Sequence, residues 1–251
     1  MPRSFLRRGL RDPVKKEIAM QLVASAENSS LNWKAQYRYI AYNVEHDAQE
    51  NRGYTAGIIG FTSRTHDLLQ LVRYYEKIAP NNLLTPFLPA LKKVEGTASR
   101  AGLGRLFVMA WKAAARDPQF QKAQDHERDR VYFTPALRQA KADGLQELGQ
   151  FINYDALVMH GPGEDPSSFG GIRTAARKTA PLPSDGGEEA TFLTAFLDAR
   201  KRVMKAERGH QDTSRVDTMQ RKFLKEGNLG LDPPLEFSVY GDKYRIPRRE
   251  T

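Results

Sequence analysis

The stretch DPVKKEIAMQLVASAEN, residues 12–28, carries the clearest structural signal in this chain of 251 residues. Asp12 followed by proline is typical of a helix start, because the carboxylate caps free backbone N–H groups and proline fits the first helical turn. Apolar residues then recur every three or four positions, which is the spacing of one helix face. The pattern predicts an amphipathic helix that ends near Asn28 and holds Glu27 in its last turn.

Weaker signals of the same kind predict that the rest of the chain is also mainly helical. Further helices are predicted over residues 66–78, 103–116, 134–159, 188–208 and 213–226. Strand signals are restricted to the apolar run TAGIIGF at 55–61 and to residues 236–244. The glycine- and proline-rich stretches at 160–171 and 180–187 are predicted loops. We therefore expect a single domain, 1–251, whose core comes from helix packing.

The chain is basic, with a formal net charge of +9 and a pI near 9.7. Such a balance is compatible with a polyanionic partner, but a nucleic-acid site requires clustered basic residues. Here the basic residues concentrate at the two ends and otherwise alternate with acids, as in KAQDHERDR at 122–130, which indicates a solvated helix surface. We expect no nucleic-acid partner.

Cysteine is absent, and no window reaches the roughly 18 consecutive apolar residues of a membrane span. The chain is therefore expected to be soluble, with no disulfide, no membrane association and no signal peptide within it. Motifs of zinc proteases, P-loops and serine hydrolases are missing, and the five histidines show no metal-ligand spacing. No metal or cofactor is expected.

Acidic residues supply the chemistry that the sequence does offer. Glu27 is followed by the polar loop VEHDAQENRGYT at 44–55, which contains Glu45, Asp47 and Glu50. Hydrolysis of a glycosidic bond uses two carboxyl groups that face each other across it, one protonated and one ionised. On the pattern alone, a solvated acid at a helix end and a charged surface loop are the more common explanations.

Several long runs follow one another along nearly the whole chain. They are KKEIAMQLVASAENSSLNWKAQYRYI (15–40), RGYTAGIIGF (52–61), PALKKVEG (89–96), ERDRVYF (127–133), QAKADGLQELGQF (139–151), YDALVMHGPGEDPSSFGGIR (154–173), FLDARK (196–201) and DTSRVDTMQRKFLKEGNLGLDPPL (212–235). In sequence and in order these runs closely resemble the bacterial chitosanases of glycoside hydrolase family 46. The resemblance implies a two-lobed, mainly α, lysozyme-like fold with a small β-sheet in one lobe and a substrate cleft between the lobes.

The activity that the resemblance implies is endo-hydrolysis of the β-1,4 bonds of chitosan with inversion. Glu27, in the run AENSS, matches the general acid, and Thr55 matches a threonine that helps to hold the attacking water. The position of the general base is occupied by Glu50, where the family carries an aspartate before R-G-Y-T, and the preceding loop is several residues longer. Inversion needs carboxyl groups about 6.5–9.5 Å apart, and the longer side chain and longer loop both change the reach of Glu50. Asp47 and then Glu45 therefore stay open as alternative bases.

The resemblance also implies substrate-binding and supporting residues. Substrate-binding positions are matched by Ser29, Tyr39, Arg52, Asp67, Tyr132, His160 and Glu207. An ion network that supports the general acid is matched by Asp155, Arg200 and Arg215. Gln211 stands where a relative carries an acid, so one contact to the substrate's amines is expected to be missing. The implied partners are chitosan and glucosamine oligosaccharides, and a secreted monomer is expected.

Two other functions remain open at this point. The first is a lysozyme-like hydrolase that acts on chitin or peptidoglycan, and faster cleavage of acetylated than of deacetylated polymer would select it. The second is a non-catalytic helical protein that binds a polyanion through its basic ends, and steeply salt-dependent binding of nucleic acid would select that one.

Overall fold

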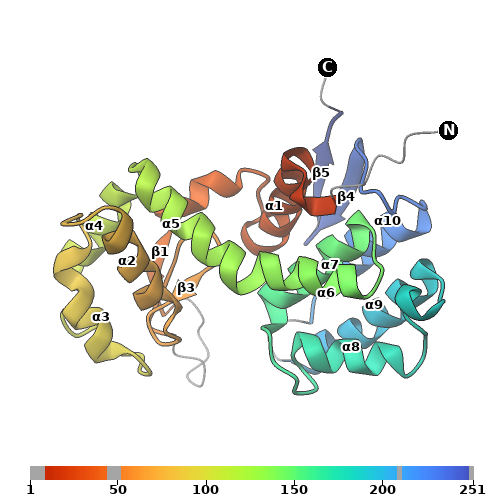
Figure 1. Cartoon of the computed structure of the whole chain (residues 1–251). Coiled ribbons are helices and arrows are strands. Elements are labelled where there is room, and N and C mark those ends of the chain that lie inside the picture. Colours follow the sequence, from red (N-terminus) through yellow and green to blue (C-terminus); the bar gives the residue numbers. More distant parts are fainter. Residues whose placement is uncertain (1–8, 44–51, 208–210, 249–251) are drawn as a thin grey trace. The chain divides into compact units, whose positions relative to one another are not determined.

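The computed structural model describes residues 9–43, 52–207 and 211–248 of the chain (Figure 1). The chain divides into two compact units, and each is described by itself. Unit 1 combines Met1–Leu31 with Tyr132–Thr251, and unit 2 is Asn32–Val131. Both units consist mainly of helices and each contains one small antiparallel sheet, so the prediction of a mainly α fold is confirmed. A small sheet was expected in one lobe only, and the structure has a second, two-stranded sheet in unit 1.

Unit 1 is built on the helix that the sequence predicted most clearly. Its helices are α1 (Pro13–Asn28), α6 (Thr134–Ala142), α7 (Glu147–His160), α8 (Phe169–Arg177), α9 (Glu189–Ala206) and α10 (Arg221–Lys225). The Asp12 carboxylate accepts hydrogen bonds from the backbone N–H groups of Val14 and Lys15, at 2.9 and 3.3 Å. Ser29 ends α1 in the left-handed conformation, with φ 48°. The predicted helix is therefore confirmed at both ends.

The single helix predicted over residues 134–159 is wrong, because the structure has two helices there. α6 ends at Ala142 and α7 begins at Glu147. Gly144 lies between them with φ +80°, a conformation that glycine adopts readily and that no helix contains. Asp143 is buried beside it and accepts bonds from Arg173 of α8, at 2.5 and 2.8 Å. A glycine turn and a contact distant in sequence thus interrupt an otherwise helical pattern.

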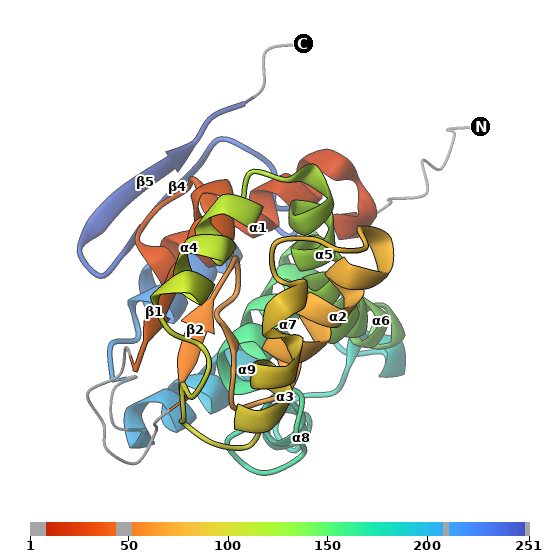
Figure 2. The same ribbon diagram turned by 90° about the vertical axis from the view of Figure 1, so that its left-hand side faces the viewer.

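The carboxyl end of unit 1 is a β-hairpin rather than the one strand predicted at 236–244. β4 (Leu235–Val239) pairs antiparallel with β5 (Asp242–Ile246), and Figure 2 shows the two strands side by side. The turn consists of Tyr240 and Gly241, both with positive φ. The hairpin lies against a short π-helix, η6 (Arg215–Gln220), which continues into α10.

Unit 2 contains a three-stranded antiparallel sheet of β1 (Ile40–Tyr42), β2 (Tyr54–Ala56) and β3 (Phe61–Thr62), in that order. The run 55–61 is therefore not one strand. It spans the end of β2, a turn and the start of β3, because Gly57 and Gly60 have positive φ and reverse the chain.

The helices of unit 2 enclose an aromatic core. They are α2 (Asp67–Ile78), α3 (Leu88–Val94), α4 (Arg105–Ala114) and α5 (Pro118–Arg128). Trp111 is fully buried and packs edge-on against Phe120. The prediction that the run 122–130 is a solvated helix surface is only partly confirmed. Lys122, His126 and Arg130 are exposed, but Glu127 and Arg128 are buried and form ion pairs with their sequence neighbours. In the part of the chain that the structure describes, no helix is long and apolar enough to cross a membrane.

Candidate active site

Glu27 lies in the last turn of α1, directly before the left-handed Ser29. Its side chain is 35% exposed, so the carboxyl group can reach solvent. One of its oxygens, Oε1, accepts a bond of 2.7 Å from Nη2 of Arg215 in η6. A carboxylate held at one oxygen and accessible to solvent can take part in proton transfer.

The Arg215 bond connects Glu27 to a buried ion network within unit 1. Nη2 of Arg215 also donates to Oδ1 of Asp155, at 2.7 Å. The other Asp155 oxygen, Oδ2, accepts from Nη1 of Arg200, again at 2.7 Å. Asp155 lies on α7 and Arg200 on α9, and both side chains are fully buried. The structure thus brings three helical elements and the end of α1 together around one carboxylate.

The network fixes the charge state of its central carboxylate. Burial alone would raise the pKa of Asp155, but the charges of Arg215 and Arg200 outweigh burial and hold that pKa at about 2. Burial would likewise lower the pKa of Arg215, but Asp155 and Glu27 raise it above its usual value. At neutral pH, Asp155 is therefore an anion and Arg215 a cation.

Gln220 is a member of this network that the sequence did not reveal. Its Nε2 donates to Oδ2 of Asp155 at 2.7 Å, and its Oε1 accepts from Nη1 of Arg200 at 3.1 Å. Gln220 and Arg215 are the two ends of η6, whose π-helical i→i+5 bonding places both side chains toward Asp155. A π-helix has no reliable sequence pattern, so the five-residue spacing was not recognised as a signal.

His160, predicted to contact substrate, also joins the network. It ends α7, is half-buried, and its Nε2 lies 3.2 Å from Nε of Arg200. An arginine N–H can only donate, so Nε2 of His160 is the acceptor of this bond. His160 thus contacts the arginine that is bound to Asp155.

Three further predicted positions of unit 1 lie at the ends of its elements. Ser29 is exposed at the end of α1 and is hydrogen-bonded to Tyr244 of β5. Glu207 is the half-buried residue that ends α9, and Tyr132 lies half-buried in the short π-helix Asp129–Phe133. Gln211 is exposed.

The predicted positions of unit 2 that the structure describes cluster around its sheet. Thr55 is half-buried in β2, opposite Thr62 of β3, and Arg52 is exposed two residues before β2. The backbone oxygen of Tyr39 accepts a bond of 2.8 Å from the N–H of Gly57, which lies directly after β2.

Asp67 begins α2 in the same unit. Its Oδ1 accepts from the N–H groups of Thr62 and Leu68 and from the hydroxyl of Thr65, at 2.9 to 3.0 Å. Burial raises the pKa of Asp67 to about 6, although these hydrogen bonds act in the opposite direction. The carboxylate of Asp67 therefore ties the start of α2 to β3 and to Thr65, and its pKa lies near 6.

Glu50 and its alternatives Asp47 and Glu45 all lie outside the described residues. Among the described residues, no group of three His, Asp or Glu side chains is arranged to hold a metal ion.

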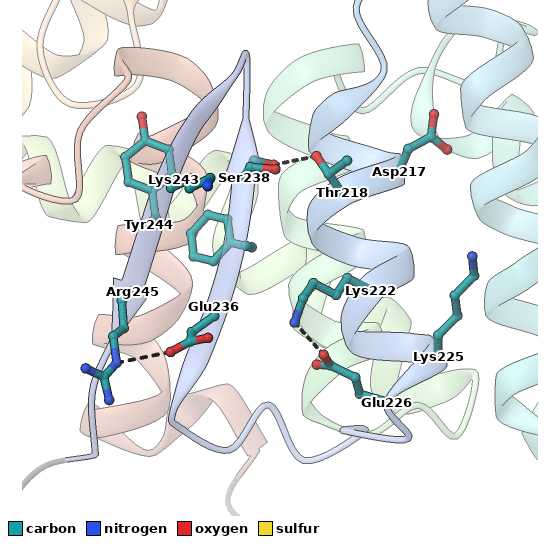
Figure 3. Close-up of a pocket in the computed structure, with 11 residues that line it drawn as sticks. Asp217, Thr218, Lys222, Lys225, Glu226, Glu236, Ser238, Lys243, Tyr244 and Arg245 are labelled. Carbon is teal, nitrogen blue, oxygen red and sulfur yellow. Dashed lines mark hydrogen bonds and ion pairs between the residues drawn. The ribbon is translucent and has the colours of Figure 1, made fainter.

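A surface pocket of about 800 Å³ lies on unit 1 beside the β4–β5 hairpin (Figure 3). Four of its charged residues form two pairs, Lys222 with Glu226 and Glu236 with Arg245. None of the predicted site residues lines it. The hydroxyl of Thr218 donates to the backbone oxygen of Ser238 there, so the pocket marks where the hairpin is fastened to η6.

Comparison with known proteins defines the class of this one. The family model of glycosyl hydrolase family 46 matches residues 21–235. A chitosanase of Streptomyces sp. (strain N174) is 62% identical over 238 residues, which cover 95% of this chain and 84% of that protein. The match spans both units, so the whole described fold is that of a glycoside hydrolase.

Two solved structures support the same assignment. A chitosanase named OU01, crystallised with substrate, has a TM-score of 0.88 and 54% identity and covers 95% of this chain and 98% of its own. A chitosanase of Gynuella sunshinyii in complex with chitotetraose has a TM-score of 0.81 and 32% identity, with coverages of 94% and 98%. The chain belongs to glycosyl hydrolase family 46.

Proposed function

We propose that the protein is an endo-acting chitosanase that hydrolyses the β-1,4 bonds of chitosan with inversion at the anomeric carbon. Family membership supports the activity, because the relatives compared above are chitosanases. The observation that carries the mechanism is Glu27, a solvent-accessible carboxyl group whose Oε1 is held by Arg215. Family membership also argues against a non-catalytic, polyanion-binding protein.

In this mechanism Glu27 is the general acid. The Arg215 bond uses Oε1, so Oε2 carries the proton that passes to the glycosidic oxygen as the bond to the leaving sugar breaks. Glu50, assisted by the hydroxyl of Thr55, removes a proton from the water that attacks the opposite face of the sugar. Asp155 and Arg200 act only by holding Arg215 in place.

The remaining predicted residues are proposed to bind substrate. They are Ser29, Tyr39, Arg52, Asp67, Tyr132, His160 and Glu207. Carboxylates among them can accept charge-assisted hydrogen bonds from the protonated amines of glucosamine, and hydroxyl groups can bond to the sugar. The substrates are chitosan and glucosamine oligosaccharides, and no metal or cofactor takes part in the proposed steps.

We further propose that both units act as one catalytic domain, since the family match extends across them. A monomer that acts outside the cell is the simplest form of the enzyme, because polymeric chitosan is too large to import. The exposed large apolar side chains of the described residues are Val14, Leu83, Leu106, Met109 and Tyr240. This set is too small for an obligate apolar interface.

The test is proton NMR of a glucosamine hexamer during hydrolysis by the wild type, Glu27→Gln and Glu50→Gln. The first reducing ends should be α-anomers, and each variant should lose about 10²–10⁴ in kcat, the range of one proton-transfer group. Glu188→Gln is a matched control, since this exposed glutamate of unit 1 makes no capping bond to α9.

Each other outcome contradicts a defined part of the proposal. β-Anomers would refute inversion, and an active Glu50→Gln enzyme would move the base to Asp47 or Glu45. Absence of cleavage by the wild type, or faster cleavage of acetylated polymer, would refute the chitosanase function.

A further inference from the structure

Tyr240 stands at the tip of the β4–β5 hairpin and is the one aromatic residue among the exposed large apolar side chains of the described chain, at 45% exposure. Neither the charge pattern nor the family resemblance assigned it a role. The side chain is only partly buried, so packing in the core does not by itself explain its position.

The backbone at Tyr240 is unusual for an aromatic residue. Its φ is +53° and that of the following Gly241 is +86°, so the two form a two-residue hairpin turn with both φ values positive. Asn-Gly is the favoured pair for such a turn, because asparagine tolerates this conformation and bulky residues do not. A tyrosine in this backbone conformation is strained, and strained residues concentrate at functional sites.

Two hydrogen bonds fix the hairpin tip to the element that carries Arg215. The N–H of Tyr240 donates to Oγ of Ser214 at 2.8 Å, and Ser214 directly precedes Arg215 in the chain. Farther along η6, Thr218 donates to the backbone oxygen of Ser238 (Figure 3). The tip therefore keeps a fixed position relative to the arginine that holds Glu27.

The phenol of Tyr240 lies within the electrostatic field of the Glu27 site. Burial of the phenol group raises the pKa of Tyr240, the charge of Arg215 lowers it, and the charges of Glu27, Asp155 and Asp212 raise it. These effects agree with the geometry of the hairpin tip, which is bonded to Ser214 beside the arginine that holds Glu27, and the side chain of Tyr240 is partly open to solvent. Tyr240, Glu27 and Arg215 all belong to unit 1.

A tyrosine ring in this position suits one chemical feature of the substrate. A protonated amine is attracted to the negative face of an aromatic ring, whereas a neutral acetamide is not attracted in this way. The ring also offers an apolar body and a polar tip, which matches the mixed surface of a sugar.

We propose that Tyr240 is a specificity-determining residue of the Glu27 site, whose ring contacts the sugar unit bound beside Glu27 and selects a glucosamine ammonium over an N-acetyl group. This inference rests on the proposed chitosanase function. It adds a contact from the carboxyl-terminal hairpin to the binding residues proposed above.

The experiment compares three variants that separate the ring, the hydroxyl and the turn. Tyr240→Asn and Tyr240→Gly remove the ring but tolerate positive φ, so the hairpin should be retained. Tyr240→Phe keeps the ring and removes only the hydroxyl. Lys243→Ala, an exposed position on β5 of the same hairpin, is the matched control.

Binding is measured by calorimetry in the Glu27→Gln background, with a glucosamine hexamer and with the same hexamer carrying N-acetyl groups. The two ring-free variants should bind the glucosamine hexamer about 3- to 30-fold more weakly, the range of one cation–π contact. Binding of the acetylated hexamer should change much less, and the Phe and Lys243→Ala variants should resemble the parent. In the enzyme with Glu27 intact, KM for the glucosamine hexamer should rise by a similar factor.

Equal affinity of the Asn variant and its parent for the glucosamine hexamer would overturn the proposal. So would an equal loss for both hexamers, because the ring would then contact the sugar without selecting its amine. If Tyr240→Asn melts at a lower temperature than its parent, the affinities of Tyr240→Gly for the two hexamers decide between these outcomes. Failure of the wild type to cleave the glucosamine hexamer would refute the chitosanase function, whereas cleavage with unchanged variants refutes the Tyr240 inference alone.

Discussion

Replacing Asp155 with alanine would remove the carboxylate that two buried guanidinium groups share. Arg200 and Arg215 each donate to it at 2.7 Å, and both side chains are almost inaccessible to water. Without Asp155, two like charges would remain close together in the core with Glu27 as the only carboxylate among these partners. Breaking a buried ion pair by removing one partner costs about 3–5 kcal/mol.

We therefore expect Asp155→Ala to lower the free energy of unfolding by about 4 kcal/mol at pH 7. For a chain of this size that corresponds to a fall in melting temperature of about 8–16 °C. The penalty should shrink in acid. The folded-state pKa of Asp155 is about 2 and its ordinary value is 3.8, so its ionised form stabilises the fold above about pH 4. This contribution, about 2 kcal/mol, is lost as the pH falls through 2.

The assay is urea unfolding followed by circular dichroism, together with hydrolysis of a glucosamine hexamer at a temperature where the variant is folded. Asp198→Ala is the control, because Asp198 lies on α9 like Arg200 but forms an exposed pair with Arg221. Such a pair contributes about 0–1 kcal/mol. Asp155→Ala should also lose activity, because Asp155 holds Arg215 and Arg215 is the residue that fixes Glu27. Unfolding curves for Asp155→Ala that overlay those of the control would refute the network's role.

Other residues give shorter tests. Gln220→Leu removes one hydrogen bond to Asp155 and one to Arg200 and leaves these buried groups partly unsatisfied. It should therefore lower the free energy of unfolding, measured in urea, by about 1–3 kcal/mol. Arg173→Ala should cost about 3 kcal/mol by leaving Asp143 buried and unpaired, and a melting temperature equal to the wild type would contradict this. Asp67 has a pKa raised to about 6, so its stabilising contribution is complete below about pH 4 and is lost as the pH rises through 6. Asp67→Asn should therefore gain about 1–2 kcal/mol relative to the wild type at pH 8, with no gain at pH 4.

Where local signals agree, the sequence predicts the fold well. α1 has an N-cap, a proline in its first turn and a regular apolar face, and each of these acts within a few residues of the helix. The interruption at Gly144 was missed because the apolar period continues on both sides of it. What decides the conformation there is Asp143 reaching Arg173, 30 positions away, and no local pattern reports such a contact.

The candidate site depends even more on distant contacts. Glu27 and Arg215 are 188 positions apart in the chain, and composition alone would not pair them. Only the resemblance to a known family indicated that these residues belong together. Gln220 and Tyr240 were missed for different reasons. A π-helix changes which side chains share a face, and the aromatic residue in a positive-φ turn is recognisable only once the backbone is known.

The charge of the protein at first conflicts with a polycationic substrate. The chain carries a net charge of +9, but charges at the surface are screened over about 8 Å at physiological ionic strength. Beside Glu27, the positive charges of Arg200 and Arg215 face the negative charge of Asp155, which therefore offsets one of them. The charge that a glucosamine chain meets at Glu27 is therefore set by these neighbours rather than by the net charge of the whole protein. Because Asp155 is shared by both arginines, Arg215 can hold the Glu27 carboxyl group while the positive charge beside the substrate's amines is reduced.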